Sequence, residues 1–313
     1  MPTMKLRLTS SEVPSGFPVF RSRLNVNVNV SGPTITGKLP TSNFPQGFSP
    51  RKILLLPHNM KKNHFHPKIS IITIVYNGAT LLEGTIQSVI NQSYPNIEYL
   101  IIDGGSTDGT LDLIQKHEAS ISKWISEADK GLYDAMNKGL KLATGDFVWF
   151  MNAGDHILKP DTVEKMVAVC PPNTDIIYGE VMLVNDERQH QGTRSELTTQ
   201  KLPTQLNWKS LQKGMVVCHQ GFLPKRTLAP SYMLDNLSAD IDWVINCLKQ
   251  AKVTTNTNMV LAEYLMGGIS KQRHNQSLKD RYAILGKHYG FLANLWNHFL
   301  IVWRALFSSS ERY

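Results

Sequence analysis

The sequence is poor in cysteine and lacks a long apolar run, and these absences exclude several classes of protein. Its three cysteines, Cys170, Cys218 and Cys247, lie far apart and form no C-x-x-C pair, which argues against a disulfide framework and against a zinc cluster. No uninterrupted apolar core with a cleavage site follows the basic residues near the amino terminus, so we predict no signal peptide. A reducing cytoplasm is the expected location.

The apolar residues near the carboxyl terminus predict an amphipathic helix and not a membrane span. Six of them recur at helical spacing: Leu292, Leu295, Trp296, Phe299, Trp303 and Leu306. Polar residues interrupt the run, whereas a span needs ~20 predominantly apolar residues. A helix in the membrane interface and a helix packed on protein both fit the pattern. Peripheral contact with the inner face of the plasma membrane is therefore one expectation for this tail.

The excess of positive charge belongs to one segment of the chain. The net charge is +8, from 33 Lys and Arg against 25 Asp and Glu. Residues 1–68 hold ten of these basic side chains and a single acid, Glu12, which leaves 23 basic and 24 acidic side chains in the rest. The charge therefore does not indicate a nucleic-acid partner. Residues 1–67, rich in Ser, Thr, Asn and Pro, are predicted to be a basic, mostly disordered extension.

From residue 68 onward the hydrophobic pattern alternates between strands and helices. The predicted elements are strand 69–76, helix 80–91, strand 97–103, helix 109–117, strand 122–127, helix 132–142, strand 146–151 and helix 160–169. This alternation predicts an α/β fold with a mostly parallel sheet. Because parallel strands share one polarity, we expect Tyr76, Asp103 and Asp155 along the same edge of the sheet.

An apolar run that stops at an acid and two glycines is the most informative single stretch. Residues 97–110 have the sequence IEYLIIDGGSTDGT. Asp103 ends the predicted strand, where a carboxylate can accept hydrogen bonds from the N–H or O–H groups of a base or a sugar. The glycines let a flat ring approach the backbone. Taken alone, the stretch fits equally well an ordinary strand-turn-helix whose acid caps the helix.

Three further segments, taken with this stretch, resemble the nucleotide-sugar half of the inverting GT-A glycosyltransferases of family 2. They are SIITIVYN at 70–77, EADKG at 127–131 and WFMNAGD at 149–155. The resemblance is to the bacterial polysaccharide, or colanic-acid, type and covers about residues 68–270, which we expect to form the catalytic domain, with 271–313 as a helical tail. It implies the GT-A fold, a Rossmann-like, mostly parallel sheet with helices on both faces.

The resemblance also implies roles for individual residues. It places Tyr76 against the nucleoside and Asp103 on the base. Asp129 and Lys130 would line the nucleotide pocket, although a surface turn also explains this segment. The family's acid-x-acid metal motif corresponds to residues 152–155.

Metal binding is where the sequence departs from the family. Only Asp155 remains as a charged ligand, and Asn152, which is also expected to bind the nucleotide sugar, can add a neutral oxygen ligand. The resemblance therefore implies a Mg²⁺ or Mn²⁺ ion held mainly by Asp155 and by the donor diphosphate, whose charge it would neutralise.

A later segment, VVCHQGF at 216–222, is predicted to be an apolar strand broken by a polar pair. His219 has two open interpretations, a contact with the acceptor or diphosphate and a structural role.

In SADIDWVI at 238–245 the family places an acid pair that supplies the catalytic base. Asp240 keeps the second position of that pair, and inversion by one in-line displacement needs such a base beside the acceptor hydroxyl. A helix N-terminal acid is the alternative for Asp240, and Asp242 is expected to be structural.

The sequence thus predicts a transferase that moves a sugar from a nucleotide-diphosphate donor, a UDP- or GDP-sugar, to a glycan or lipid-linked acceptor with inversion, in cell-surface polysaccharide biosynthesis. One alternative is a sugar-nucleotide nucleotidyltransferase, which would need a glycine-rich loop with Arg and Lys after the first strand. Residues 76–80, YNGAT, form no such loop. The other alternative is a non-catalytic nucleotide-binding module, and the retention of Asp240 argues against it.

Overall fold

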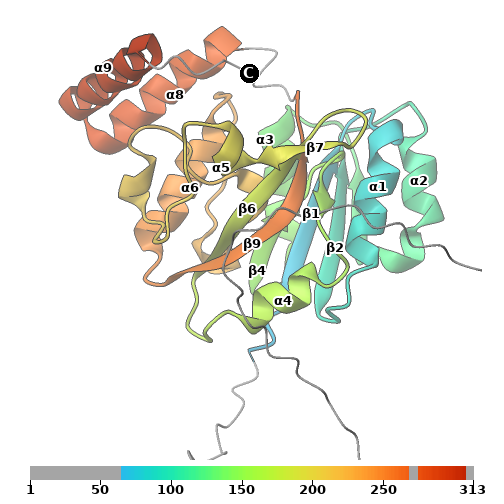
Figure 1. The fold of residues 1–313 in the computed structure, drawn as a ribbon. Helices are drawn as coiled ribbons and strands as arrows, with labels where there is room; N and C mark the ends of the chain where they lie inside the picture. The colour runs from blue at the N-terminus through green and yellow to red at the C-terminus, as the bar shows by residue number, and fades with distance from the viewer. Residues whose placement is uncertain (1–64, 268–273, 308–313) are drawn as a thin grey trace, which may run out of the picture. The chain divides into compact units, whose positions relative to one another are not determined.

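The computed structural model describes residues 65–267 and 274–307, so most of the predicted extension lies outside the described residues. Eight predicted elements are present, with ends that differ from the prediction by at most two residues. They are β1 (Ile69–Val75), α1 (Ala79–Ile90), β2 (Ile97–Asp103), α2 (Thr110–Lys116), β3 (Lys123–Ser126), α3 (Leu132–Leu142), β4 (Phe147–Phe150) and α4 (Thr162–Ala168). The alternation of strands and helices is confirmed (Figure 1).

The strands form two sheets. The first has the order β3-β2-β1-β4 and is parallel throughout, which confirms the mostly parallel sheet. The second has the order β5-β9-β6-β7, with β8 paired to β6, and was not predicted. Its strands are β5 (His156–Ile157), β6 (Ile176–Val184), β7 (His190–Thr193), β8 (Phe222–Pro224) and β9 (Thr254–Leu265). Within it β6 and β9 run parallel.

Alternate side chains of the parallel strands belong to two cores, one on each face. Ile69 and Ile71 of β1 pack in the core that α1 and α4 cover. Ile72 and Ile74 pack in the other core, under α3 and α6 (Ala239–Gln250). Because both faces are buried, β1, β2 and β4 are mostly apolar at successive positions, whereas the edge strand β3, KWIS, is exposed at both ends.

The strand predicted at 216–222 is wrong over most of its length. Val216 and Val217 are buried outside any strand, and residues 219–221 form a short 3₁₀ helix before β8 begins at Phe222. A Cβ on Gly221 would lie only 2.5 Å from the carbonyl oxygen of Gly179 in β6. The segment is therefore a turn packed closely against the second sheet, and its apolar residues are buried by packing without strand pairing.

The tail consists of α8 (His274–Tyr289) and α9 (Phe291–Phe307). Asp242 of α6 anchors α8, because it accepts hydrogen bonds from Lys287 Nζ at 3.0 Å and from His288 Nε2 at 2.7 Å. Burial opposes the charge of Asp242, but these two partners prevail and the pKa lies below its ordinary value. This geometry supports a structural role for Asp242. Of the described helices, none combines the length and the hydropathy that a transmembrane span requires.

A buried acid near the start of β2, Glu98, joins residues beside the starts of β1 and β4. The Glu98 carboxylate accepts hydrogen bonds from Lys68 Nζ at 2.9 Å, from Ser70 Oγ at 2.5 Å and from Thr144 N at 2.7 Å. Burial disfavours its charge, but the hydrogen bonds outweigh burial and lower the pKa of Glu98 to about 2.

We expect Glu98→Gln to lower the free energy of unfolding by ~2–3 kcal/mol, since charge-assisted hydrogen bonds are lost. The folded pKa of about 2 lies below the ordinary 4.5, so this stabilisation is complete above pH 4.5 and is lost as the pH falls toward 2. Urea unfolding at a series of pH values measures it, with the exposed Glu187→Gln as control. If the difference in unfolding free energy between the wild type and Glu98→Gln does not shrink in acid, the assignment is contradicted.

Candidate active site

The loops that follow the parallel strands meet at one edge of the first sheet, which we call the carboxyl edge. Gly104 N donates to Val75 O at 2.9 Å, and Ala153 N donates to Ile74 O at 3.2 Å. These bonds join the loops after β2 and β4 to the end of β1. Ligands of open α/β sheets bind at such an edge.

Asp103 organises the turn after β2 from a fully buried position. Its Oδ2 accepts hydrogen bonds from Gly105 N at 3.1 Å, Ser106 N at 3.0 Å and Ser126 Oγ at 2.6 Å, and its Oδ1 accepts one from Ser106 Oγ at 2.5 Å. The carboxylate is thus engaged within the chain. Base binding by Asp103 stays a prediction, and the geometry favours a scaffolding role.

Asp129 and Tyr76 lie beside the backbone of Gly104. A Cβ on Gly104 would be 2.5 Å from Asp129 Oδ2 and 3.3 Å from Tyr76 Cδ2, so only glycine lets the acid and the ring approach this backbone. Asp129 Oδ1 accepts a hydrogen bond from Gly131 N at 2.8 Å, whereas Oδ2 accepts none from the described residues. The Tyr76 side chain is 66% exposed, and Lys130 is exposed next to the acid.

Asp155 is buried and links the loop after β4 to the second sheet. Its Oδ2 accepts a hydrogen bond from Gln220 Nε2 at 2.8 Å, and its Oδ1 accepts one from Leu265 N at 3.0 Å. Burial raises the pKa of Asp155 to about 7, although these two bonds and the Arg188 charge act in the opposite direction. Nearby in the sequence, Asn152 Oδ1 is buried and has no hydrogen-bond partner in the described part of the chain.

These groups do not fit a divalent ion held by Asp155. Mg²⁺ and Mn²⁺ take several oxygen ligands, but each oxygen of Asp155 already accepts a hydrogen bond, and of these groups only Asn152 Oδ1 has no partner among the described residues. Within residues 65–267 and 274–307 no group of three or more His, Cys, Asp or Glu side chains could hold a metal. The metal-ligand role of Asp155 stays a prediction, and the geometry argues against it, because the carboxylate already accepts hydrogen bonds from the protein's own amides.

Asp240 lies in the first turn of α6 and is half-buried. Burial raises its pKa, while the hydrogen bond from Ile241 N and the charges of Arg281 and Arg194 lower it. A carboxylate with a raised pKa accepts a proton more readily. Ser238 occupies the N-cap position of this helix, but its side chain makes no capping hydrogen bond, because its Oγ donates to the carbonyl oxygen of Ser277 at 3.1 Å.

Asp155 and Asp240, which are far apart in the sequence, act electrostatically on the same side chains. Burial raises the pKa of Tyr264, and the negative charges of both acids raise it further. Burial also raises the pKa of the Cys218 thiol, and the charges of Asp155 and Asp240 raise it further. The acid of the first sheet and the acid of α6 are therefore within range of the same side chains.

His219 is buried in an aromatic cluster. Its Nε2 lies 2.6 Å from Tyr232 Oη, and its ring centroid lies 5.2 Å from that of Phe150 and 5.4 Å from that of Trp243. Burial lowers the pKa of His219 to about 4, which keeps the ring neutral near pH 7. This geometry supports the structural interpretation of His219.

The comparison with known proteins decides the family. Residues 70–228 match the model of glycosyl transferase family 2. The chain belongs to glycosyltransferase family 2. This membership makes it a transferase and decides against the nucleotidyltransferase alternative.

Relatives and solved structures of similar fold agree with this membership. A PGL/p-HBAD biosynthesis glycosyltransferase of Mycobacterium tuberculosis is 30% identical over 215 residues, which cover 65% of this chain and 79% of the relative. EpsE of Bacillus subtilis, also named a glycosyltransferase, is 34% identical over 158 residues, 49% of this chain and 54% of EpsE.

Two solved structures show the same fold. S. aureus TarS in complex with UDP-GlcNAc superimposes with a TM-score of 0.57 at 17% identity, covering 78% of this chain and 68% of TarS. The mannosyltransferase PcManGT of Pyrobaculum calidifontis, in complex with GDP-Man and Mn²⁺, gives 0.52 at 18% identity, with coverage of 78% and 77%. The predicted GT-A fold is confirmed.

We expect Asp155→Asn to leave any effect of Mn²⁺ on nucleotide binding by this glycosyltransferase unchanged, because the carboxylate is engaged by amides. The folded pKa of about 7 lies above the ordinary 3.8, so the wild type loses stability as the pH rises from 3.8 to 7, and the uncharged variant loses less. Calorimetry with UDP and GDP, with and without Mn²⁺, and urea unfolding across that pH range measure both effects.

The exposed Asp186→Asn is the matched control for this substitution. A folded Asp155→Asn protein that loses a Mn²⁺-dependent gain in affinity would restore Asp155 as a metal ligand.

Proposed function

We propose that this glycosyltransferase moves a sugar from a UDP- or GDP-sugar to a hydroxyl of a glycan or lipid-linked acceptor, with inversion, in cell-surface polysaccharide biosynthesis. The arrangement of Tyr76, Gly104 and Asp129 at the carboxyl edge carries the proposal for the donor. Structures of similar fold that were solved with UDP-GlcNAc and with GDP-Man support this class of donor. The Mycobacterium tuberculosis relative, named for PGL/p-HBAD biosynthesis, supports a role in a biosynthetic pathway.

The base is proposed to lie on the backbone of Gly104 beside the ring of Tyr76. Asp129 Oδ2, which accepts no hydrogen bond from a described residue, then accepts one from the base. Uracil and guanine both offer a ring N–H, whereas the ring nitrogens of the adenine and cytosine pairing edges are acceptors, so a carboxylate favours the first two. Asp103 holds the turn on which the base rests.

In this proposal the side chains of Lys130 and Arg188 supply the positive charge beside the donor diphosphate. Lys130 follows Asp129 and is exposed. Arg188 donates to the carbonyl oxygen of Gly154 at 2.5 Å, and its charge acts on Asp155. We propose that both stabilise the departing diphosphate, and that Asn152 Oδ1 accepts a hydrogen bond from the donor sugar. No step of the proposal passes through a metal ion.

Asp240 is proposed as the catalytic base. It takes the proton of the acceptor hydroxyl while that oxygen attacks the anomeric carbon and the bond to the diphosphate breaks. A single displacement inverts the anomeric carbon, which proton NMR of the product tests directly. The raised pKa of Asp240 suits this task.

We expect Asp129→Asn to weaken UDP or GDP binding about tenfold, which is ~1.4 kcal/mol, because an amide nitrogen cannot accept the hydrogen bond of the base. Asp103→Asn should lower the melting temperature, since its amide nitrogen cannot accept the hydrogen bonds of the turn. Titration calorimetry and thermal melts separate the two effects, with the exposed Asp112→Asn as control. Normal affinity in a folded Asp129→Asn protein, together with lost affinity in a folded Asp103→Asn protein, would return the base contact to Asp103.

We expect Asp240→Asn to reduce turnover ~10²–10⁴-fold while nucleotide affinity stays unchanged, since a general base acts only in the chemical step. Asp242→Asn is the matched control, because its bonds to Lys287 and His288 predict a loss of stability and little loss of rate. Nucleotide release from a panel of sugar donors measures turnover. The reverse result in folded proteins would move the base to Asp242.

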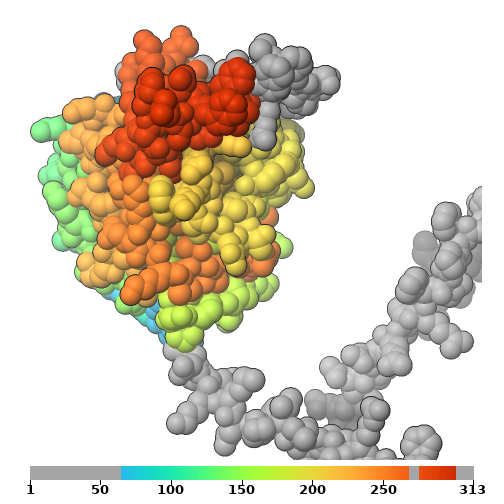
Figure 2. Space-filling view, turned by 90° about the vertical axis from the view of Figure 1, so that its left-hand side faces the viewer, coloured from blue at the N-terminus to red at the C-terminus, as the bar shows by residue number. Residues whose placement is uncertain are grey.

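Peripheral membrane association is proposed for α9. Five of its apolar side chains are at least half exposed, Phe291, Leu292, Leu295, Trp296 and Phe299, and Figure 2 shows α9 on the surface of the molecule. Such a face is typical of helices that lie in the membrane interface. The assignment of residues 271–313 as a separate tail stays a prediction, as does the catalytic domain at 68–270.

We expect Leu292→Glu with Trp296→Glu to abolish co-flotation with anionic lipid vesicles, because two charges on the apolar face disfavour insertion. Val169→Glu, at another exposed apolar residue, should float like the wild type. A wild type that is dimeric by light scattering and a variant that is monomeric would instead identify α9 as a protein interface.

A further inference from the structure

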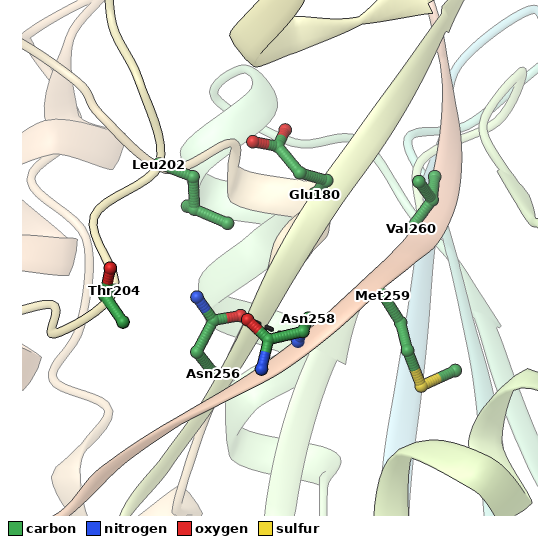
Figure 3. A pocket seen from close by; sticks show the side chains of 7 residues that line it. All are labelled: Glu180, Leu202, Thr204, Asn256, Asn258, Met259 and Val260. Atoms are coloured by element: carbon green, nitrogen blue, oxygen red, sulfur yellow. Dashed lines mark hydrogen bonds between the residues drawn. The ribbon is translucent and has the colours of Figure 1, made fainter. Parts of the chain in front are cut away.

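A cavity of about 300 Å³ lies on the second sheet and is lined by residues other than those of the proposed donor site (Figure 3). Strands β6 and β9 and the loop before the 3₁₀ helix at Trp208–Leu211 form its walls. Its lining residues are Glu180, Leu202, Thr204, Asn256, Asn258, Met259 and Val260. Its volume is at the lower end of the range typical of small-molecule sites, ~300–1,000 Å³.

The cavity exists because β9 bulges away from β6. Their register passes from Tyr178↔Asn256 to Glu180↔Val260, so Gly179 alone faces the intervening residues 257–259 of β9. A bulge of this kind turns side chains out of the regular pleat, and bulges recur beside ligand sites. The opening is therefore a feature of the strand pairing itself.

Three residues keep the bulge in its conformation. A Cβ on Gly179 would lie 2.6 Å from Thr257 Oγ1 and 2.7 Å from the carbonyl oxygen of Met259, so no larger residue fits there. Asn258 has φ +52, in the left-handed region that Asn tolerates better than most residues. Asn256 Oδ1 accepts a hydrogen bond from Asn258 N at 2.8 Å, which holds this backbone in place.

The polar groups of the lining retain hydrogen-bonding capacity for a ligand. Glu180 Oε1 accepts a hydrogen bond from Ser195 Oγ, but Oε2 accepts none from the described residues. The side chains of Thr204 and Asn258 likewise have no hydrogen-bond partner within the described part of the chain. Figure 3 shows Leu202 and Thr204, on the loop, facing Asn256 and Asn258 across the opening.

This combination of groups matches a carbohydrate. A carboxylate, two amides and a hydroxyl suit a ligand with several hydroxyl groups, and Leu202 and Val260 offer apolar surface to its C–H faces. The Glu180 charge disfavours acidic sugars, because like charges repel at close range. The chemistry therefore favours a neutral hexose.

A short helix connects the cavity to the proposed base. In α5 (Arg194–Leu197), Ser195 donates to Glu180 at the cavity. Arg194, one residue earlier, donates to the carbonyl oxygen of Val216 at 3.2 Å, and its charge acts on Asp240. The same helix thus borders both the cavity and the neighbourhood of Asp240.

We propose that the cavity is an acceptor subsite, which holds a neutral hexose of the glycan acceptor at a distance from the hydroxyl that reacts. The proposal rests on the proposed function, in which Asp240 activates that hydroxyl. The subsite would fix the acceptor chain on the second sheet while the donor occupies the carboxyl edge of the first.

Saturation-transfer NMR on the full chain tests the subsite with methyl glucoside, methyl galactoside, methyl mannoside and methyl glucuronide as probes. At least one neutral hexoside should bind, and the glucuronide should not. Glu180→Ala and Asn258→Gly should each weaken hexoside binding at least tenfold. The second variant keeps the backbone conformation, since glycine accepts a positive φ, so the test does not depend on the stability of the first.

Nucleotide binding keeps this test separate from the proposed function. Both cavity variants should bind UDP or GDP like the wild type, whereas Asp129→Asn should bind the nucleotide about tenfold more weakly and retain hexoside binding. If nucleotides bind and no hexoside does, or if hexoside binding survives both cavity substitutions, the subsite is overturned and the donor site stands. If hexosides bind at the cavity and neither UDP nor GDP binds, the proposed function fails and the carbohydrate site stands.

Discussion

The buried carboxylate of Asp155 joins the two sheets at the edge where the proposed site lies. It follows β4 of the first sheet and accepts hydrogen bonds from Leu265 at the end of β9 and from Gln220 in the turn before β8. A buried charge of this kind is costly unless its partners are in place. The positions of β9, of the turn at Gln220 and of the loop after β4 therefore depend on one another. The charge of Asp240 acts on side chains of the same region, Tyr264 of β9 and Cys218 beside the turn.

The first sheet was predictable from the sequence because three of its four strands, β1, β2 and β4, are buried on both faces. The seven residues of β2, Ile97–Asp103, are apolar except at Glu98 and at the end, and their bounds were predicted correctly. The second sheet follows different rules. β9 mixes polar and apolar residues, TTNTNMVLAEYL, and pairs in parallel with a strand far away in the sequence. Val216 and Val217 show the converse, since apolar residues without strand partners were predicted as a strand.

The sequence predicted residues of the proposed site but not which of their atoms lack a hydrogen bond within the described residues. Asp103 ends β2 and Asp129 follows β3, and only the structure of the turn at Gly104 shows that Asp103 is hydrogen-bonded within the chain and that Asp129 lies near Tyr76. His219 was open to two interpretations, and burial favours the structural one. Gln220 was noted only as part of a polar pair, because its contact with Asp155 spans 65 residues. The cavity at the β9 bulge had no sequence signature, since a register shift depends on both strands.

The most direct test of the account is a crystal structure of the full chain with UDP and with GDP. The account predicts that the base lies over the Gly104 backbone beside the Tyr76 ring, with its ring N–H within hydrogen-bonding distance of Asp129 Oδ2. Asp103 should keep its bonds to Gly105, Ser106 and Ser126. A nucleotide bound away from the carboxyl edge, or an Asp103 carboxylate turned out to the base, would contradict it.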